Sequence, residues 1–171
     1  RAFPAAGSNA NPADTPLRLT FDAPPILGSS GSVRIHRSSD NAVVDVLPLS
    51  GDVDALGYPG QDRVRVVARQ ALRVDGNALV IAPHSHALAP ATAYYVVIDN
   101  GVVSASTLGG TAFDGLGIVA GWSFTTAPAP AAAASLVVDD DGPADFRSVQ
   151  GALDFAMQNY AADEPLRIDI R

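Results

Sequence analysis

Three consecutive carboxylates, Asp139, Asp140 and Asp141, form a dense group of oxygen ligands in this 171-residue sequence. Calcium prefers such ligands, but the chain lacks the spaced ligands and the distal Glu that a calcium-binding loop would carry after Gly142. Asp before Gly is also typical of turns, because the Asp side chain accepts hydrogen bonds from the backbone that follows it. We therefore predict a solvated turn that leads into a helix, and no metal site.

Two imidazoles, those of His84 and His86, are separated by one residue and can point to the same side of a strand. A zinc site needs a third or fourth ligand at suitable spacing, and none is suggested nearby. The segment is therefore interpreted as a surface loop. No Gly-x-Ser-x-Gly elbow presents a nucleophilic Ser, and the chain has no Cys. The sequence thus predicts neither a catalytic triad nor a thiol nucleophile.

Aromatic side chains are the other candidate for ligand contact. Tyr94 and Tyr95 are consecutive in a predicted strand, so they point to opposite faces and one of them can reach solvent. Tyr95 and Trp122 are the candidate sugar contacts. The alternative is that these rings pack in the core, as aromatic residues in strands commonly do.

The composition points to a β protein. All 11 basic residues are Arg, and among 18 acidic residues only Glu164 is Glu. Lys and Glu are strong helix formers, so a mainly helical fold is disfavoured. The net charge of −7 argues against a nucleic-acid or anionic-membrane surface. No apolar run is long enough to span a membrane, and no motif indicates a cofactor. The chain is expected to be monomeric.

Short alternating segments separated by turns predict seven or eight strands before residue 127, at the spacing of a β-sandwich. The predicted strands, with a long loop at 48–62, are 17–21, 33–36, 43–47, 64–67, 72–74, 79–81, 94–98 and 122–125. Residues 1–8 are predicted to be a flexible lead-in to a domain at 9–126.

The pattern changes after residue 126. Residues 127–134 contain only Ala and Pro and predict a semi-rigid linker. Residues 135–171 then predict a strand, a helix over 146–160 with Asp145 as N-cap, and a second strand at 166–170. One helix and two short strands cannot bury a core alone, so this tail is expected to pack on the first domain or to begin a longer one.

The first region resembles bacterial Ig-like domains of the S-layer type. The similarity rests on the Asn-rich opening and Thr-Phe strand of 11–22, the Leu-Ala-Pro-Ala-Thr-Ala-Tyr passage of 88–94, and the closing Trp-Ser-Phe-Thr-Thr of 122–126. The resemblance implies an Ig-like β-sandwich. The long 48–62 loop departs from a minimal member of that family.

The tail resembles the start of bacterial pectinesterases, which are right-handed parallel β-helices. The matching passages are Val137–Gly142 and Arg167–Ile170, and between them the residues that fit the motif are Asp141, Gly142, Asp145, Phe146, Gln150 and Ala152. In that family these residues start the fold, with a cap helix before the first β-helix strand. Pro143 and Ala144 stand where the family has a small Ser-Gly pair. The family's catalytic carboxylates lie on later turns, so they are expected after Arg171 and none is assigned in this chain.

These resemblances imply the non-catalytic front of a secreted or periplasmic pectinesterase, with pectin or another plant cell-wall polysaccharide as the partner of the parent enzyme. The 171 residues alone are expected to be inactive. Two alternatives remain open on the sequence: a stand-alone carbohydrate-binding or adhesive Ig-like module, and a structural module of the cell surface.

Overall fold

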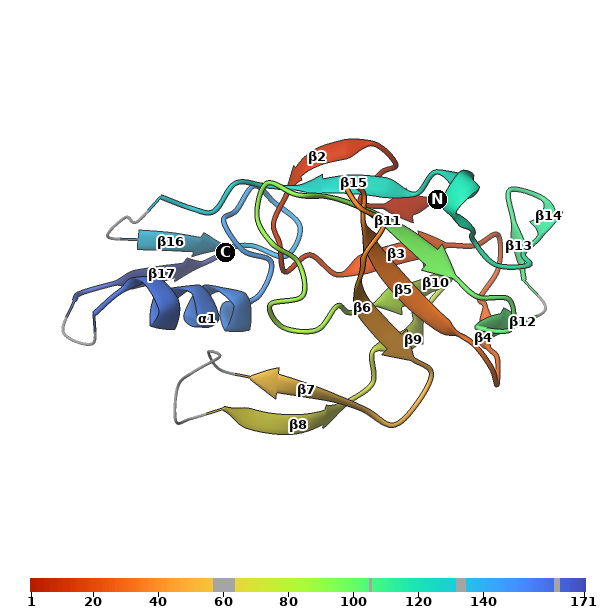
Figure 1. Ribbon diagram of the computed structural model, residues 1–171, viewed down its shortest axis with the longest axis horizontal. Coiled ribbons are helices and arrows are strands. Elements are labelled where there is room, and N and C mark those ends of the chain that lie inside the picture. The colour runs from red at the N-terminus through yellow and green to blue at the C-terminus, as the bar shows by residue number, and fades with distance from the viewer. Residues whose placement is uncertain (57–63, 105, 132–134, 162–163) are drawn as a thin grey trace.

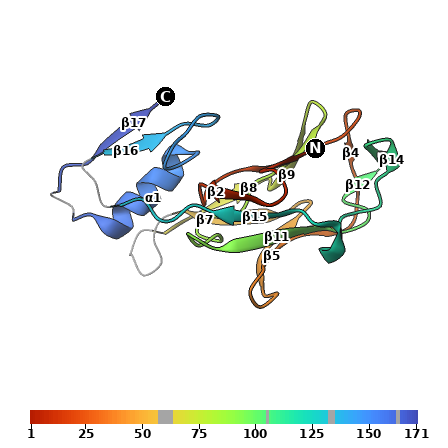
Figure 2. The ribbon, with the colours of Figure 1, turned by 90° about the horizontal axis from the view of Figure 1, so that it is seen from above.

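The computed structural model describes residues 1–56, 64–104, 106–131, 135–161 and 164–171. Figure 1 shows two parts: a β-rich body that extends to β15, and a smaller unit made of β16, α1 and β17. Figure 2 shows the same two parts from above, with one end of α1 directed toward the body. None of the helices in the described part of the chain is long and apolar enough to cross a membrane.

The body contains two main sheets. One has five strands in the order β2 (Ser8–Asn11), β15 (Ser123–Thr126), β11 (Ala93–Ile98), β5 (Ser32–Arg37) and β6 (Val43–Pro48). The other has four strands in the order β1 (Ala2–Phe3), β3 (Leu17–Thr20), β10 (Ala78–Ile81) and β9 (Leu72–Asp75). All neighbours are antiparallel except β2 and β15, which run parallel.

One hydrophobic core joins the two sheets, because side chains alternate between the faces of a strand. Leu17 and Leu19 of β3 are buried while Arg18 and Thr20 between and beyond them are not. They share the core with residues of the five-stranded sheet, including Ile35, Tyr94 and Phe124. The alternation in the sequence therefore predicted the buried face correctly.

Four short strands and a 3-10 helix complete the body at the end opposite the small unit. β4 (Ile26–Leu27) pairs with β12 (Val103–Ser104), and β13 (Thr107–Leu108) pairs with β14 (Thr111–Ala112). The 3-10 helix η1 spans Ile118–Ala120. Elements this short carry too little alternation to be predicted from the sequence.

Residues 1–8 are not a flexible lead-in. β1 pairs with β3, and Ser8 of β2 lies opposite Phe124 of β15. Their side chains show no strand periodicity, but the backbone completes the edges of both sheets. The N-terminal ammonium group also donates to the carbonyl of Thr20 at 2.7 Å.

The predicted loop at 48–62 is partly wrong as well. It contains β7 (Asp52–Leu56), which pairs with β8 (Arg65–Arg69) in an antiparallel ribbon; residues 57–62 of this prediction lie outside the described residues. The polarity of the ribbon is inverted, since the carboxylates of Asp52 and Asp54 are buried while Val53 and Val66 are 54% and 65% exposed. An apolar-inside pattern cannot identify such a strand.

The small unit is a strand–helix–strand arrangement. β16 (Ser135–Val138) and β17 (Arg167–Ile170) pair in parallel, and the helix α1 (Val149–Asn159) connects them. Its own small core contains Leu136, Val138, Phe146 and Ala152. The predicted helix began three residues too early: Ser148, and not Asp145, is the N-cap, and its hydroxyl accepts from the N–H of Gly151. Part of the predicted linker, residues 132–134, lies outside the described residues.

Two valines on the neighbouring strands β5 and β6, one buried and one exposed, give a matched test of the core. Val33 of β5 is fully buried, whereas Val46 of the neighbouring β6 is 50% exposed. Val33→Ala should lower the free energy of unfolding by about 2 kcal/mol, from lost burial and the cavity that remains. Val46→Ala should change it by less than about 0.5 kcal/mol. Urea denaturation measures both, and equal losses would contradict this assignment of faces.

Candidate functional site

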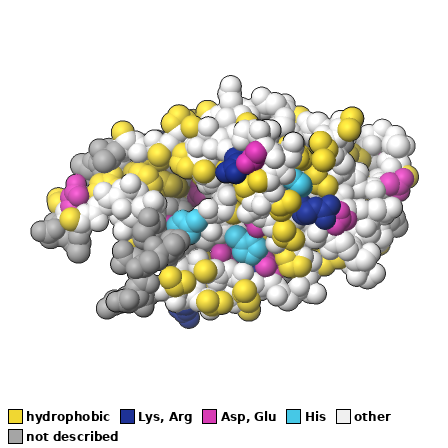
Figure 3. All heavy atoms as spheres, in the orientation of Figure 1, with side chains coloured by type: hydrophobic (Ala, Val, Ile, Leu, Met, Phe, Trp, Pro, Cys, Tyr) yellow, Lys and Arg dark blue, Asp and Glu magenta, His cyan; other side chains and the backbone are white. Residues whose placement is uncertain are grey.

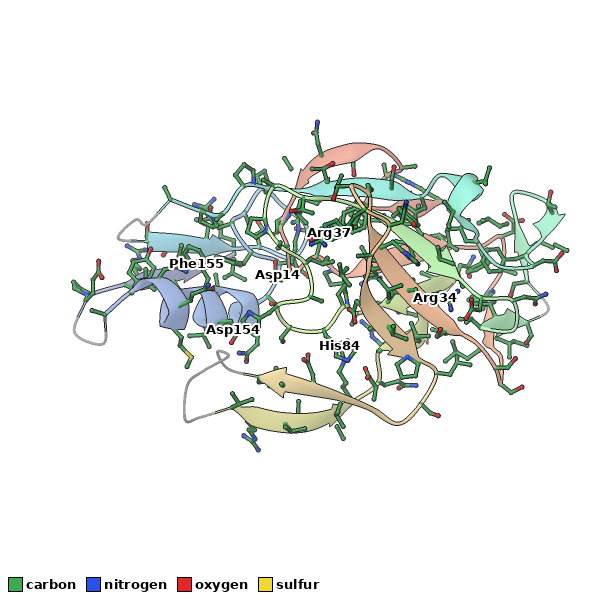
Figure 4. All side chains as sticks on the ribbon, viewed as in Figure 1. Asp14, Arg34, Arg37, His84, Asp154 and Phe155 are labelled. Carbon is green, nitrogen blue, oxygen red and sulfur yellow. The ribbon has the colours of Figure 1, made fainter. Side chains whose placement is uncertain are left out.

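The imidazole of His84 lies between two buried carboxylates at the end of the body that faces the small unit. Its Nδ1 is 2.6 Å from Oδ1 of Asp45 in β6, and its Nε2 is 3.0 Å from Oδ1 of Asp52 in β7. The backbone N–H of His84 donates to the other oxygen of Asp45 at 2.9 Å. His84 therefore joins the five-stranded sheet to the ribbon. Figure 4 shows it directed toward the ribbon.

This environment favours the protonated ring. Burial alone would lower the pKa of His84, but the hydrogen bonds and charges of Asp45 and Asp52 outweigh it and raise the pKa above its ordinary value of 6.5. An imidazole donates from both ring nitrogens only when it is protonated. The imidazolium thus donates to both carboxylates at once.

Arg69 neutralises the remaining acidic groups of the ribbon. Its Nη1 donates to Oδ2 of Asp54 at 2.8 Å, and its Nε lies 3.4 Å from Oδ2 of Asp52. The same guanidinium donates to the carbonyls of Ala82 and Pro83, which precede His84. Buried charges persist only when they are paired in this way. The inverted polarity of the ribbon is therefore what attaches it to the loop.

A second contact links the same loop to the helix of the small unit. Nε2 of His86 is 3.6 Å from Oδ2 of Asp154 in α1, and Gln150 donates to the other oxygen of Asp154 at 2.8 Å. Asp154 is buried although it lies on a helix surface.

The N-terminus of α1 rests on the carboxylate of Asp14, which precedes β3. Asp14 accepts from the backbone N–H of Arg147 at 2.9 and 3.0 Å, and from the N–H and hydroxyl of Ser148 at 2.7 Å each. The first N–H groups of a helix have no partner within the helix and attract negative charge. Asp14 supplies both the acceptor and the charge.

Glycine at position 151 permits this approach. A Cβ atom there would lie 2.5 Å from Oδ2 of Asp14, closer than any real contact. Glycine lowers the stability of a helix because it loses more conformational entropy on folding than other residues. Its missing side chain lets the carboxylate of Asp14 reach the first turn.

A cavity of about 660 Å³ lies at this junction. It is bordered by the ribbon, by the 82–90 loop and by α1, and its lining includes Asp14, Asp54, Arg69, His84, His86, Gln150 and Asp154. In Figure 3, His and Asp side chains lie close together on this face, and hydrophobic side chains gather over the β7–β8 ribbon. The histidines predicted to lie in a surface loop are thus part of a charged junction.

The Asp139–Asp141 cluster forms the predicted turn. One oxygen of each carboxylate lies within 4.8 Å of the others. Asp139 accepts from the N–H of Gly142 at 2.9 Å and of Asp141 at 3.2 Å. These hydrogen bonds, that of Gly142 first, lower the pKa of Asp139. The geometry is that of a turn in which Asp139 stabilises the backbone.

The residues that match the pectinesterase motif have structural contacts. Asp145 accepts from the N–H of Val137 at 2.9 Å, which attaches the segment before α1 to β16. Phe146 and Ala152 are in the small core, and Gln150 orients Asp154. Asp141 and Gly142 are in the turn with Asp139.

The two candidate sugar contacts are buried, Trp122 in the hydrophobic core and Tyr95 on the opposite face of β11. Trp122 is 3% exposed and its indole N–H donates to the carbonyl of Pro4 at 3.0 Å. Tyr95 is 9% exposed, its ring stacks on that of His36 at 4.8 Å, and its hydroxyl donates to Asn41. Sugar contact by either residue stays an untested prediction.

Comparison with known families identifies the body. A family model described as bacterial Ig-like domain matches residues 1–126, which is most of the chain. The chain therefore belongs to the bacterial Ig-like domain family, and this part of the expected fold is confirmed. The match begins at residue 1, in agreement with the pairing of β1. No curated protein and no solved structure matches the chain.

The raised pKa of His84 predicts a pH-dependent contribution to stability. That contribution is fully present below pH 6.5, the ordinary value for the unfolded chain, and is lost as the pH rises through the higher folded pKa. Near pH 5.5 the substitution His84→Gln should lower the free energy of unfolding by about 2 kcal/mol, because it removes hydrogen bonds between charged groups. Near pH 9 the loss should be smaller. Urea titrations of both proteins at the two pH values measure this difference. A difference that stays constant or widens with pH would contradict it.

The contact of Asp14 with α1 gives another prediction. Asp14→Ala should destabilise the small unit by about 1–2 kcal/mol, because it removes the acceptor of two backbone N–H groups and one hydroxyl at the start of the helix. Hydrogen exchange of the Arg147, Ser148 and Gly151 amides measures the effect. Asp40→Ala is the matched control, since Asp40 pairs with Arg37 on the exposed surface of the body. Equal exchange in the Asp14 and Asp40 variants would refute the role of Asp14.

Proposed function

We propose that this bacterial Ig-like protein is the non-catalytic front of a pectinesterase, in which the Ig-like body holds the first strands of a parallel β-helix. The observation that carries the proposal is the parallel pairing of β16 with β17 around α1, seated on Asp14. Parallel strands require a crossover connection, and here the helix that forms it is fixed to the preceding domain.

The small unit leaves several apolar side chains exposed to solvent. Ile170 of β17 is 66% exposed, and Val149, Leu153 and Met157 of α1 are 40–49% exposed. A two-stranded sheet is not stable alone in water. These apolar surfaces favour further strands that continue from β17, as the resemblance to pectinesterases implies.

The contacts of the motif residues agree with a fold-starting role. Asp145 holds the segment before the helix to β16, and Asp139 orders the turn that includes Gly142. Their carboxylates already accept backbone hydrogen bonds. In the proposed enzyme, a carboxylate nucleophile and an acid/base partner come after Arg171, and the enzyme acts outside the cytoplasm, where plant cell-wall pectin is.

A stand-alone carbohydrate-binding or adhesive module is a weaker alternative. Its candidate sugar contacts are Tyr95 and Trp122, which are only 9% and 3% exposed. Loss of retardation on a pectin affinity gel by Tyr95→Ala, with no activity in any longer product, would favour it.

Methanol release from methyl-esterified pectin tests the proposal. The 171-residue chain should release none, and a longer product of the same reading frame should release methanol continuously. Removal of residues 1–126 from the longer product should lower its midpoint of thermal unfolding, because α1 loses Asp14. Methanol from the short chain, or none from a folded longer product, would overturn the proposal.

A further inference from the structure

Many of the side chains that line the junction cavity are polar, although the inward faces of helices and strands usually carry apolar side chains. Gln150, Asp154 and Gln158 of α1 line it at intervals of four residues, which places them on one face of the helix. The stripe one position earlier, Val149, Leu153 and Met157, is apolar and about half exposed. An ordinary surface helix has the opposite arrangement.

The opposite wall has the same inversion. Asp54 of β7 and Arg69 of β8 line the cavity, whereas Val53 and Val66 on the other face of the ribbon are exposed. His84, Ser85 and His86 complete the wall between the ribbon and the helix. Three separate elements thus direct hydrogen-bonding groups into one space.

These groups are held in position by contacts with one another. Asp54 accepts from Arg69 at 2.8 Å and from the hydroxyl of Ser85 at 3.2 Å, and Gln150 donates to Asp154 at 2.8 Å. Each carboxylate oxygen can accept more than one hydrogen bond. Leu88, Phe146 and Phe155 add apolar surface to the lining. A pocket that combines apolar surface with a few fixed polar groups is typical of a small-molecule site.

The charges of the lining select the class of ligand. Four carboxylates, Asp14, Asp54, Asp145 and Asp154, outnumber the guanidinium of Arg69 and the imidazolium of His84, so an anion is repelled. A metal ion is also disfavoured, because the one close trio of ligands found among the described residues is Asp139–Asp141, which is not part of the lining. A neutral molecule with many hydroxyl groups matches both the carboxylates and the amides.

We infer that the junction cavity binds a neutral saccharide. Its volume of about 660 Å³ is in the range of small-molecule pockets. Sugar hydroxyls donate to Asp54 and Asp154 and exchange hydrogen bonds with Gln150 and Gln158, while the C–H faces of the ring pack against Leu88 and Phe155. The inference that the cavity binds a saccharide does not depend on the proposed function. The choice of a sugar derived from pectin does rest on it, and methyl-esterified pectin is the neutral form of that polymer.

Isothermal titration of the full chain tests this inference with three probes: a fully methyl-esterified trigalacturonide, the same trimer after saponification, and cellotriose. The esterified trimer should bind with a dissociation constant on the order of 1 mM or tighter. The saponified trimer should bind about tenfold more weakly at low salt, because three carboxylates meet an acidic lining. Raising the salt concentration should narrow this gap.

Variants locate the site. Gln158→Ala should weaken binding about fivefold, the effect of one lost hydrogen bond, and Ala89→Phe should weaken it further by filling the cavity. Both residues are exposed members of the lining, so the fold should persist. Met157→Ala is the control, since it changes the outward stripe of the same helix.

The outcomes are separable from those of the methanol assay. Binding of cellotriose as tight as that of the esterified trimer supports a saccharide site and removes the preference for pectin. Three results would each overturn the inference, whatever the longer product does to pectin. The first is no heat of binding with any neutral probe at about 10 mM, tenfold above the expected dissociation constant of about 1 mM. The others are equal affinity for the saponified and esterified trimers, and unchanged affinity in both Gln158→Ala and Ala89→Phe.

Discussion

The junction depends on one carboxylate, that of Asp14, placed against the first turn of α1. Among the described residues, the body and the small unit have separate hydrophobic cores, so polar contacts account for the junction seen there. Asp14 accepts from two backbone N–H groups and one hydroxyl at the start of the helix, which are groups that need an acceptor in any case. The absence of a side chain at Gly151 allows the approach. The position of α1, and with it the helix wall of the cavity, follows from this contact.

Buried charge is the second constraint, and it explains the inverted ribbon. Asp45, Asp52 and Asp54 are each less than a tenth exposed, and an unpaired carboxylate so placed is strongly unfavourable. The protonated ring of His84 and the guanidinium of Arg69 pair with all three and connect β6, the ribbon and the loop after β10. Such a network is directional, whereas apolar packing is not. It therefore positions the polar side chains that line the cavity and leaves the valines of the ribbon in contact with solvent.

Alternation and turn residues predicted most of the long strands, because Leu17, Leu19, Val33 and Ile35 face the core in the ordinary way. They failed where the backbone alone pairs, as in β1 and β2, and where charge replaces apolar burial, as in β7. His84 and His86 drew attention as a pair, but their partners Asp45, Asp52 and Asp154 are 32 to 68 residues away in the sequence. Asp14 carries no local signal at all. The spacing of Asp52 and Asp54 with Arg69 is the one clue, since two charged strands of a ribbon can pair face to face only if those charges neutralise each other.

The central claim is that the Ig-like body and the small unit form a single docked structure through Asp14. ¹⁵N relaxation of the full chain tests it most directly, because each amide reports the tumbling of the unit that contains it. The account predicts that, in the unaltered chain, the β-strands of the body and the elements β16, α1 and β17 share one rotational correlation time. In the Asp14→Ala variant, the small unit should have a shorter correlation time than the body. A shorter correlation time for the small unit in the unaltered chain would contradict the account.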